Sequence, residues 1–382
     1  MERSVEFRLN NVSPTPASLR LRPHVDAPAS ETTVNLGNLF LQYYFDSYGT
    51  AAPKPDPSRF EYLDLVSAAT DFRFHAHVTS ASKVKRRSLA TEIGQAFCRL
   101  MLAEHFAITH FAHLDEVMGK SAHGAFGGMR VERVCPGDVP DYLCARIAAG
   151  PFIAEAKGRF SSIGFHSAAF NNWRTQFTRI RVVDSSNVPR SAKGYIVATR
   201  LVTDADPTKN RTTSYIEDPN TEGEPLSEQD RSMLGRGAIA VHYARVFGKL
   251  GLLPVASALN LGYALPRQPT FQLPVWTCTS PPFQGRKYIG GYYQTVAGYT
   301  PTYTERGWQL SLELGAGHSV FIGLDADIAS RVAQAARGEW EVLNAIEPVV
   351  PEGTWSSEFA WLFDGTVAAP LLYFIPTQVM IL

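Results

Sequence analysis

Apolar and polar residues alternate in many short segments of the chain, and this pattern predicts β-strands. Near the N-terminus, "VEFRLN", "NLFLQYYFDSY" and "DFRFHAHV" have the composition or the alternation of half-buried strands. Further along, "MRVERV", "KGYIVATRLV" and "TTSYIEDP" are predicted strands of the same kind. The last run, "VAAPLLYFIPTQVMIL", is apolar, but two prolines break it and it is too short to span a bilayer, so we expect a buried terminal strand.

Segments with helical spacing of apolar residues separate these strands. The segment "SASKVKRRSLATEIGQAFCRLMLAEHF" is a predicted helix, with Ser88 or Thr91 as the expected N-terminal cap. The segment "GFHSAAFNNWRTQFTRIRVV" places Phe165, Trp173 and Phe177 roughly on one side of a second helix. Two more helices are expected in the last third, in "MLGRGAIAVHYARVFGKLGLL" and "DADIASRVAQAARGEWEVLNAI".

The order of these elements predicts the fold class and the domains. From about Ser88 to Val202 the order is helix, three strands, helix, strand, which indicates an α/β (α+β) protein with a mixed sheet flanked by helices. We expect a strand-rich segment at 1–59 that ends in the Pro-rich linker "AAPKPDPSR", a domain with the mixed sheet at 60–218, and an additional C-terminal α+β domain of unknown role at 219–382.

Composition narrows the classes of function. The chain has 382 residues, of which 45% are hydrophobic, so it has enough apolar surface for a sizeable core. Lys plus Arg and Asp plus Glu number 36 each, and therefore any binding to nucleic acid must use a local basic patch. The four cysteines form no CxxC pair and "MERSVEFRLNNVSP" lacks the apolar run of a signal peptide, so we expect a reducing, cytoplasmic setting.

The segment "VPDYLCARIAAGPFIAEAKGRF" carries charged residues where a buried strand is expected. Residues two apart on a strand face the same side, so Glu155 and Lys157 project together, and Asp141 joins them if the register of the preceding strand allows. Two converging carboxylates suit Mg²⁺, and a lysine beside the metal orients a water or stabilises charge on a phosphate. Metal-assisted hydrolysis of a phosphodiester needs these parts. A solvated Glu–Lys pair is the alternative interpretation.

These residues resemble the PD-(D/E)xK nuclease superfamily, which has the restriction-endonuclease-like fold. The resemblance is carried by "PD" ending at Asp141, by "ExK" from Glu155 to Lys157, by the continuation "KGR", and by the following helix with "NNWRTQF". It covers about Leu89 to Val202, roughly a third of the chain. It implies that Asp141 and Glu155 bind the metal, and that Lys157 assists the attacking water.

The resemblance also points to residues on the two flanking helices. Many members of the superfamily place a glutamate on the helix before the core, and Glu92 matches that position, which implies a catalytic and metal-binding role. A glutamine or basic residue on the following helix often completes the site, and Gln176 is the candidate.

Basic side chains near this segment are the predicted contacts to a phosphate backbone. The densest run is "KVKRRS", for which a solvated helix entry is an equally good explanation. The predicted nucleic-acid-binding residues are Lys83, Lys85, Arg86, Arg87, Arg159 and Arg174.

We therefore predict a Mg²⁺- or Mn²⁺-dependent nuclease, an endonuclease or an exonuclease, that acts on nucleic acid, with DNA favoured as substrate. Analogy with nucleases that carry unfamiliar extra domains associates it with prokaryotic antiviral defence. We expect no membrane association, and we expect control by a regulatory partner protein or by homo-oligomerisation. The alternative is a catalytically inactive scaffold or binding subunit that keeps the nuclease fold, and the neutral overall charge and the large unmatched regions support it. Metal binding separates the two, because the nuclease must bind the cation and a scaffold need not.

Overall fold

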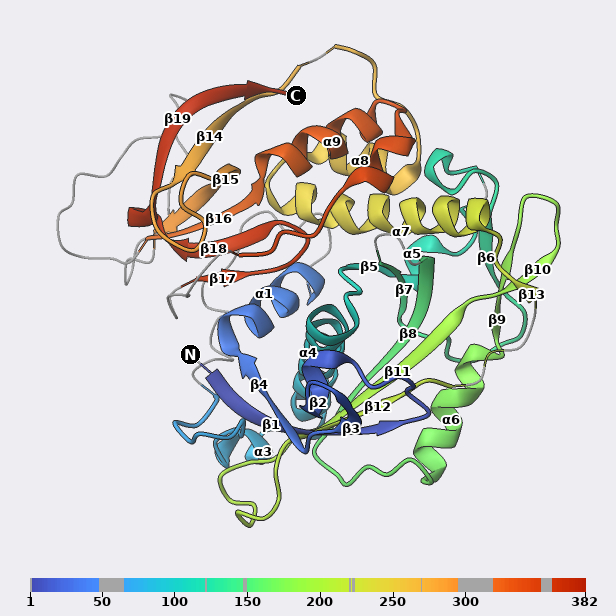
Figure 1. Cartoon of the computed structure of the whole chain (residues 1–382), viewed down its shortest axis with the longest axis vertical. Helices are drawn as coiled ribbons and strands as arrows, with labels where there is room; N and C mark the ends of the chain where they lie inside the picture. Colours follow the sequence, from blue (N-terminus) through green and yellow to red (C-terminus); the bar gives the residue numbers. More distant parts are fainter. Residues whose placement is uncertain are drawn as a thin grey trace.

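A seven-stranded mixed sheet forms the centre of the first two thirds of the molecule (Figure 1). The computed structural model describes residues 2–47, 65–120, 122–146, 150–219, 221, 224–268, 270–294, 319–351 and 359–382. The strand order across the sheet is β4 (Glu31–Asn35), β1 (Glu2–Asn10), β12 (Thr213–Glu217), β11 (Lys193–Arg200), β8 (Gly150–Arg159), β7 (Tyr142–Arg146) and β5 (His110–His113). The pairs β1–β12 and β11–β8 are parallel, and the others are antiparallel.

The helix α4 (Lys83–Phe106) covers one face of this sheet, which we call the α4 face. Its apolar residues Cys98, Met101 and Leu102 pack in one cluster with Ala154 and Ala156 of β8. Because side chains alternate along a strand, Glu155 and Lys157 project from the opposite face. The alternation of β8 therefore separates an apolar surface for α4 from a surface that carries charge.

Two helices pack on the opposite face, which we call the α6 face. The helix α6 (Ala168–Phe177) places Phe170 and Trp173 against Ile196 and Ala198 of β11. The long helix α7 (Glu228–Lys249) contacts β5, β7 and β8. Figure 1 shows α7 between the seven-stranded sheet and the C-terminal unit, so this helix belongs to the cores of both.

A second, antiparallel sheet organises the C-terminal part of the chain. Its strand order is β17 (Ala360–Trp361), β18 (Thr366–Pro370), β16 (Ser319–Asp325), β15 (Lys287–Gln294), β14 (Gln272–Cys278) and β19 (Phe374–Ile381). The helices α8 (Leu253–Leu261) and α9 (Ala326–Ala336) accompany it. The part of the chain after the first sheet is therefore an α+β unit that shares α7 with the first sheet.

Smaller elements complete the fold. A four-stranded sheet has the order β13 (Glu224–Pro225), β10 (Pro189–Ser191), β9 (Ile180–Val183) and β6 (Arg130–Arg133). A hairpin joins β2 (Arg20–Arg22) to β3 (Val25–Pro28). The short helices are α3 (His77–Ser80) and α5 (Leu114–Val117). Single 3₁₀ turns are Ala17–Leu19, Gly124–Phe126, Trp340–Ala345 and Leu371–Tyr373.

A buried ionic cluster ties the first helix, α1 (Leu36–Ser47), to α4, β5, β7 and α7. The carboxylate of Asp46 accepts hydrogen bonds from the Arg99 guanidinium at 2.6 Å and from the Tyr142 hydroxyl at 2.6 Å, and it lies 2.9 Å from Nε2 of His113. Arg245 of α7 donates to the backbone oxygen of Asp46 at 2.8 Å. The pKa of Asp46 is held well below its usual range, because burial alone would raise it but the charges of Arg99 and His113 outweigh burial.

The predicted mixed sheet flanked by helices is confirmed, and α4, β7, β8, α6 and β11 follow the predicted order along the chain. The predicted strand "MRVERV" forms β6, but it lies in the four-stranded sheet, and the edge place beside β7 is taken by β5, which was not predicted. Several local predictions were wrong. The segment "NLFLQYYFDSY" forms α1 instead of a strand, because the Asn35 side chain caps a helix by accepting from the backbone N–H groups of Gly37 and Asn38. The segment "DFRFHAHV" makes isolated bridges and then enters α3. The cap of α4 is Ser82, which accepts from Lys85 N.

The C-terminal run forms strands as predicted, but its last strand is not buried. β19 pairs with β14 on one side only and lies at the edge of its sheet. Ile375, Val379 and Ile381 are all at least half exposed. The Pro-rich linker predicted at 51–59 lies outside the described residues.

Candidate active site

The antiparallel pairing of β7 with β8 brings Asp141 next to the "ExK" segment. Tyr142 is the register partner of Ala154, so Asp141 lies at the level of Glu155 and Ala156. The Oδ2 atom of Asp141 accepts a hydrogen bond from the backbone N–H of Ala156 at 2.8 Å. Its backbone oxygen accepts from Leu114 N at 2.8 Å, so both ends of the residue are fixed.

The side chains of Asp141, Glu155 and Lys157 converge. The Lys157 ammonium forms an ion pair with Oε1 of Glu155, and its Nζ atom lies 3.7 Å from Oδ2 of Asp141. The Glu155 side chain is fully buried, whereas the side chains of Asp141 and Lys157 are 22% and 31% exposed. The site therefore has a buried carboxylate at its base and opens to solvent through the other two residues.

The protonation states reflect this burial. Burial raises the pKa of Glu155 well above its ordinary value, the neighbouring Asp141 carboxylate raises it further, and Lys157 offsets only part of the shift. Burial alone would lower the pKa of Lys157, but the carboxylates of Asp141 and Glu155 outweigh it and raise that pKa. The site thus strongly favours a positive charge between its two carboxyl groups.

Buried side-chain oxygens without a hydrogen-bond donor in the described part of the chain occur on Glu155 of β8 and on Gln176 of α6. Gln176 is 5% exposed and lies on α6, one turn after Trp173, which packs against the sheet. Buried oxygens without donors are suited to a hard cation, and Mg²⁺ is commonly bound by one or two carboxylates with water completing its shell. The carboxylates of Asp141 and Glu155 are therefore ligands of the kind that Mg²⁺ or Mn²⁺ prefers.

The structure does not bring Glu92 into this group. Ala90 and Gly94 are the α4 residues that meet the backbone of Gly158, and Glu92 lies about 200° around the helix from Ala90. Its carboxylate instead accepts a hydrogen bond from the Ser88 hydroxyl at 2.8 Å. Within the described ranges, no set of three or more His, Cys, Asp or Glu side chains is arranged to hold a metal. Protein ligands beyond the carboxylates of Asp141 and Glu155 would have to be amide or backbone oxygens.

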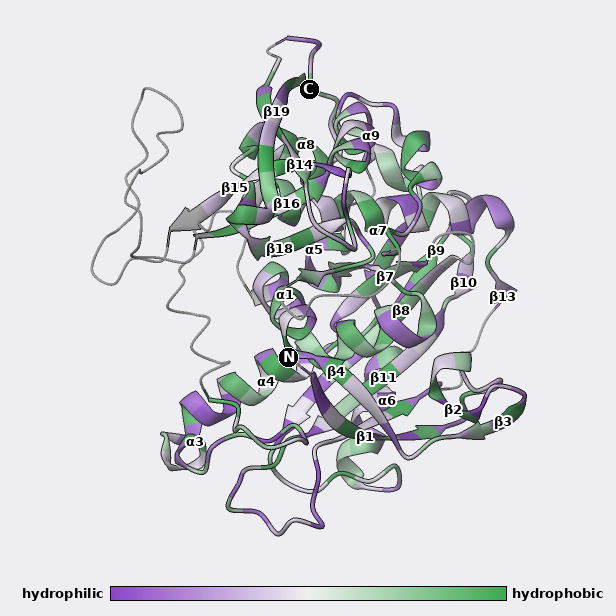
Figure 2. Cartoon of the chain, turned by 60° about the vertical axis from the view of Figure 1, so that its left-hand side comes forward, coloured by the Kyte–Doolittle hydropathy of each residue, from purple (hydrophilic) through white to green (hydrophobic). Residues whose placement is uncertain are grey.

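The basic run that precedes the core lies in the first turns of α4. Lys83, Lys85 and Arg87 are exposed, and Arg86 donates a hydrogen bond to the backbone oxygen of Thr79 at 2.8 Å. Figure 2 shows this end of α4 in the hydrophilic colour, in contrast to the helix body. These cations lie at the N-terminus of α4, which is the positive end of the helix dipole, and the first turn holds no acidic residue.

The two other predicted nucleic-acid contacts differ in how their guanidinium groups are used. Arg174 forms ion-paired hydrogen bonds to Glu217 at 2.6 and 2.7 Å and also bonds Asn171, so its contacts are explained by a structural role. Arg159 stacks over the Trp173 ring at 5.9 Å. Arg200 on β11 lies directly opposite Arg159 and was not predicted as a site residue.

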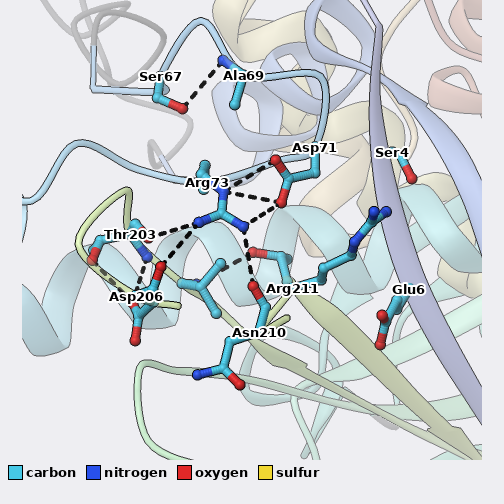
Figure 3. Close-up of polar contacts among 12 residues, drawn as sticks. Ser4, Glu6, Ser67, Ala69, Asp71, Arg73, Thr203, Asp206, Asn210 and Arg211 are labelled. Atoms are coloured by element: carbon cyan, nitrogen blue, oxygen red, sulfur yellow. Dashed lines mark hydrogen bonds and ion pairs between the residues drawn. The ribbon is translucent and has the colours of Figure 1, made fainter. Parts of the chain in front are cut away.

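A separate polar pocket of about 480 Å³ lies where residues 67–73 meet the loop 204–211. Figure 3 shows the Arg73 guanidinium enclosed there: it bonds Asp71 at 2.6 to 3.0 Å and the backbone oxygens of Thr203 and Asn210. Arg211 at its rim pairs with Glu31 at 3.0 Å. Because its cations are already paired with carboxylates, this pocket is less suited to an anionic substrate than the α6 face of β8.

The chain matches no protein-family model, no curated protein and no solved structure. None of the helices in the described ranges combines the length and the apolar character that a bilayer-crossing segment needs.

Proposed function

We propose that this protein is a metal-dependent nuclease of the PD-(D/E)xK type that hydrolyses phosphodiester bonds of nucleic acid, with DNA as the favoured substrate. The observation that carries the proposal is the convergence of Asp141, Glu155 and Lys157 on a buried strand, with one oxygen of Glu155 left without a donor. The order of α4, β5, β7, β8, α6 and β11 supports the restriction-endonuclease-like fold. The assignment to prokaryotic antiviral defence, the cytoplasmic setting and control by a partner rest on analogy and composition.

The residues have distinct roles in this proposal. Asp141 and Glu155 hold a divalent cation. Such an ion supplies a Lewis acid and a water of lowered pKa. Lys157 offsets part of the negative charge of the two carboxyl groups when no metal is bound, and its partly exposed ammonium donates hydrogen bonds to a phosphate oxygen or to the attacking water. The buried amide oxygen of Gln176 accepts a hydrogen bond from a water or ligates the cation.

The alternative, a scaffold without turnover, has its own supporting observations. Lys157 already pairs with Glu155, and among the described residues no third His, Cys, Asp or Glu side chain joins Asp141 and Glu155 in a metal-holding group. A protein that retained the fold without catalysis could keep this ion pair as a structural contact. Metal binding and turnover therefore decide between the two functions.

The test compares variants in metal binding and in cleavage. Calorimetric titration with Mn²⁺ measures metal binding. Cleavage is measured with Mg²⁺ or Mn²⁺, with and without EDTA, on four substrates: plasmid, linear duplex, single-stranded DNA and RNA. Lys157→Ala should lower cleavage by about a hundredfold or more but keep or strengthen Mn²⁺ binding, because a competing cation is removed. Asp141→Asn should lose both. Lys193→Ala is the matched control, since Lys193 is also a strand lysine paired with a carboxylate, Asp218, at 2.8 Å.

A nuclease under partner control would be silent when purified, so growth inhibition on expression in cells is the second readout. The proposal predicts that wild type inhibits growth and that both site variants do not. Absence of Mn²⁺ binding by the wild type, or equal behaviour of wild type, Lys157→Ala and Asp141→Asn in both readouts, would contradict it.

A further inference from the structure

Two arginines lie side by side on the α6 face, next to the candidate active site. The parallel register pairs Arg159 of β8 with Arg200 of β11, and it pairs Lys157 with Ala198. Neighbouring strands are about 4.8 Å apart, and two residues along a parallel strand span about 6.6 Å. Both arginines therefore start within one side-chain length of Lys157 and project from the same face.

Neither arginine has a carboxylate partner among the residues that the structure describes. Arg159 contacts the Trp173 ring, and Nε of Arg200 is buried without any hydrogen-bond acceptor. Like charges directly opposite each other on adjacent strands repel, and a buried N–H group without an acceptor carries a free-energy cost. The coincidence of these two unfavourable features at one place is typical of a site built for a ligand.

Several other arginines of the molecule are paired with carboxylates. Arg73 pairs with Asp71, Arg174 pairs with Glu217, and Arg190 pairs with Asp184, all within 3 Å. Across the sheet, Arg200 lies opposite Thr213 of β12, and Thr213 lies opposite Glu6 of β1, so this glutamate is two strands away from Arg200. The positive charge of the arginine pair is therefore not neutralised locally.

We propose that Arg159 and Arg200 form a phosphate-binding subsite that takes a second phosphodiester group of the nucleic acid, next to the one that is cleaved. The proposal rests on the proposed function for the identity of the substrate. Guanidinium groups present planar sets of N–H donors that match phosphate oxygens, and they are weakly hydrated, so a pair of them favours phosphate strongly. The Trp173 ring holds Arg159 in place. The subsite lies two residues further along β8 than Lys157, so a bound strand would continue from the metal carboxylates toward the end of β8 and β11.

The test measures oligonucleotide binding without cleavage. A fluorescein-labelled 12-nucleotide single strand and a 12-base-pair duplex are titrated in EDTA, and anisotropy is followed at several KCl concentrations. Arg200→Gln and Arg159→Gln should each weaken binding about tenfold and reduce the slope of log K against log[salt] by about 1, because one phosphate contact is lost. Arg181→Gln, which alters an exposed arginine paired with Glu132, should bind like the wild type.

Thermal unfolding controls for folding, and both glutamine variants should unfold at or above the wild-type midpoint because repulsion is relieved. The inference is overturned if the wild type does not bind either oligonucleotide in EDTA, or if folded Arg159→Gln and Arg200→Gln proteins bind with wild-type affinity and salt slope. These outcomes are distinct from failure of the proposed function. If oligonucleotide binding depends on the two arginines but the protein neither binds Mn²⁺ nor cleaves nucleic acid, the subsite stands and catalysis is rejected. If the protein cleaves nucleic acid but its binding does not depend on the arginines, catalysis stands and the subsite is rejected.

Discussion

Gly94 of α4 and Gly158 of β8 meet backbone to backbone, and neither position has room for a side chain. A Cβ atom on Gly158 would lie 1.8 Å from the Ala90 backbone oxygen, and one on Gly94 would lie 2.4 Å from the Gly158 nitrogen. Gly158 stands between Lys157 and Arg159, on the strand that carries the candidate active site. The contact therefore fixes the helix directly behind the residues on which the proposed chemistry depends.

Substitution of Gly158 by alanine should destabilise the protein by about 1–3 kcal/mol or more, because the added methyl group must push α4 away from the sheet. Chemical denaturation at neutral pH measures the change. Gly164→Ala is the control, since a Cβ at Gly164 would meet nothing within 4 Å. Equal stabilities of Gly158→Ala and Gly164→Ala would show that α4 does not pack on β8 in this way.

Stability above neutral pH should increase when Glu104 is replaced by glutamine. Burial raises the pKa of Glu104 to about 7, although a hydrogen bond with Asn38 opposes the shift. Because the folded pKa lies above the unfolded value of about 4.3, the wild type loses stability as pH rises from about 4.3 to 7. Glu104→Gln avoids this loss and should be more stable than the wild type by about 1–3 kcal/mol at pH 8, with no difference near pH 4.

Glu116→Gln is the control, because its effect on the free energy of unfolding should have the opposite sign to that of Glu104→Gln. Burial alone would raise the pKa of Glu116, but the hydrogen bonds and charge of Arg245 outweigh burial and lower it. Its ionised form therefore stabilises the fold above the unfolded pKa, and that stability is lost as pH falls through the folded pKa. Glu116→Gln should be less stable than the wild type at pH 7, and the deficit should shrink on acidification. The same sign for both variants would contradict these assignments.

Acid should destabilise the protein partly through His105. Burial lowers the pKa of His105 to about 4, and Nδ1 lies 2.9 Å from the Ser18 hydroxyl. The unfolded chain binds a proton below about pH 6.5 while the folded chain does not, so about 2 kcal/mol is lost between pH 6.5 and 5. His105→Gln should flatten the dependence of unfolding free energy on pH in this window.

Removal of one partner from the buried ionic cluster should be costly. Asp46→Asn leaves the buried Arg99 without its counter-ion, and we expect a loss of about 3–5 kcal/mol in the free energy of unfolding. The double variant Asp46→Asn with Arg99→Met should lose less than the sum of the two single variants, because the unpaired charge is gone. Asp115→Asn, at a side chain that is 81% exposed, should change stability by less than about 0.5 kcal/mol. Additive effects of the two cluster variants would argue against a direct pair.

The convergence of Asp141, Glu155 and Lys157 could be predicted because it depends on local rules. Glu155 and Lys157 share a face by the period of a strand, and Asp141 reaches them because β7 and β8 are consecutive antiparallel strands. Whether Glu92 belongs to the candidate active site depended on which side of α4 faces the sheet. The helical period gives the angle between Glu92 and Gly94, but it does not say that the glycine, and not the glutamate, meets β8.

Arg200 and α1 were missed for different physical reasons. The position of Arg200 follows from the parallel register of β11 on β8, which a crossover through α6 separates in sequence, and no local pattern sets that register. The run that forms α1 is rich in aromatic residues, which favour strands, and the decisive signal was the Asn35 cap that precedes it. The prediction of a strand followed the aromatic content, whereas the Asn35 cap favoured the helix that the structure has.

The parallel pairing of β1 with β12 also constrains the order of events during synthesis. Glu6 finds its register partner at Thr213, and Asp46 meets Arg245 only 199 residues later. At elongation rates of about 5–20 residues per second, the first strand waits about 10–40 s on the ribosome before its partner has been made. The central sheet is therefore completed late, and a chain interrupted before residue 213 has an N-terminal strand without its parallel partner.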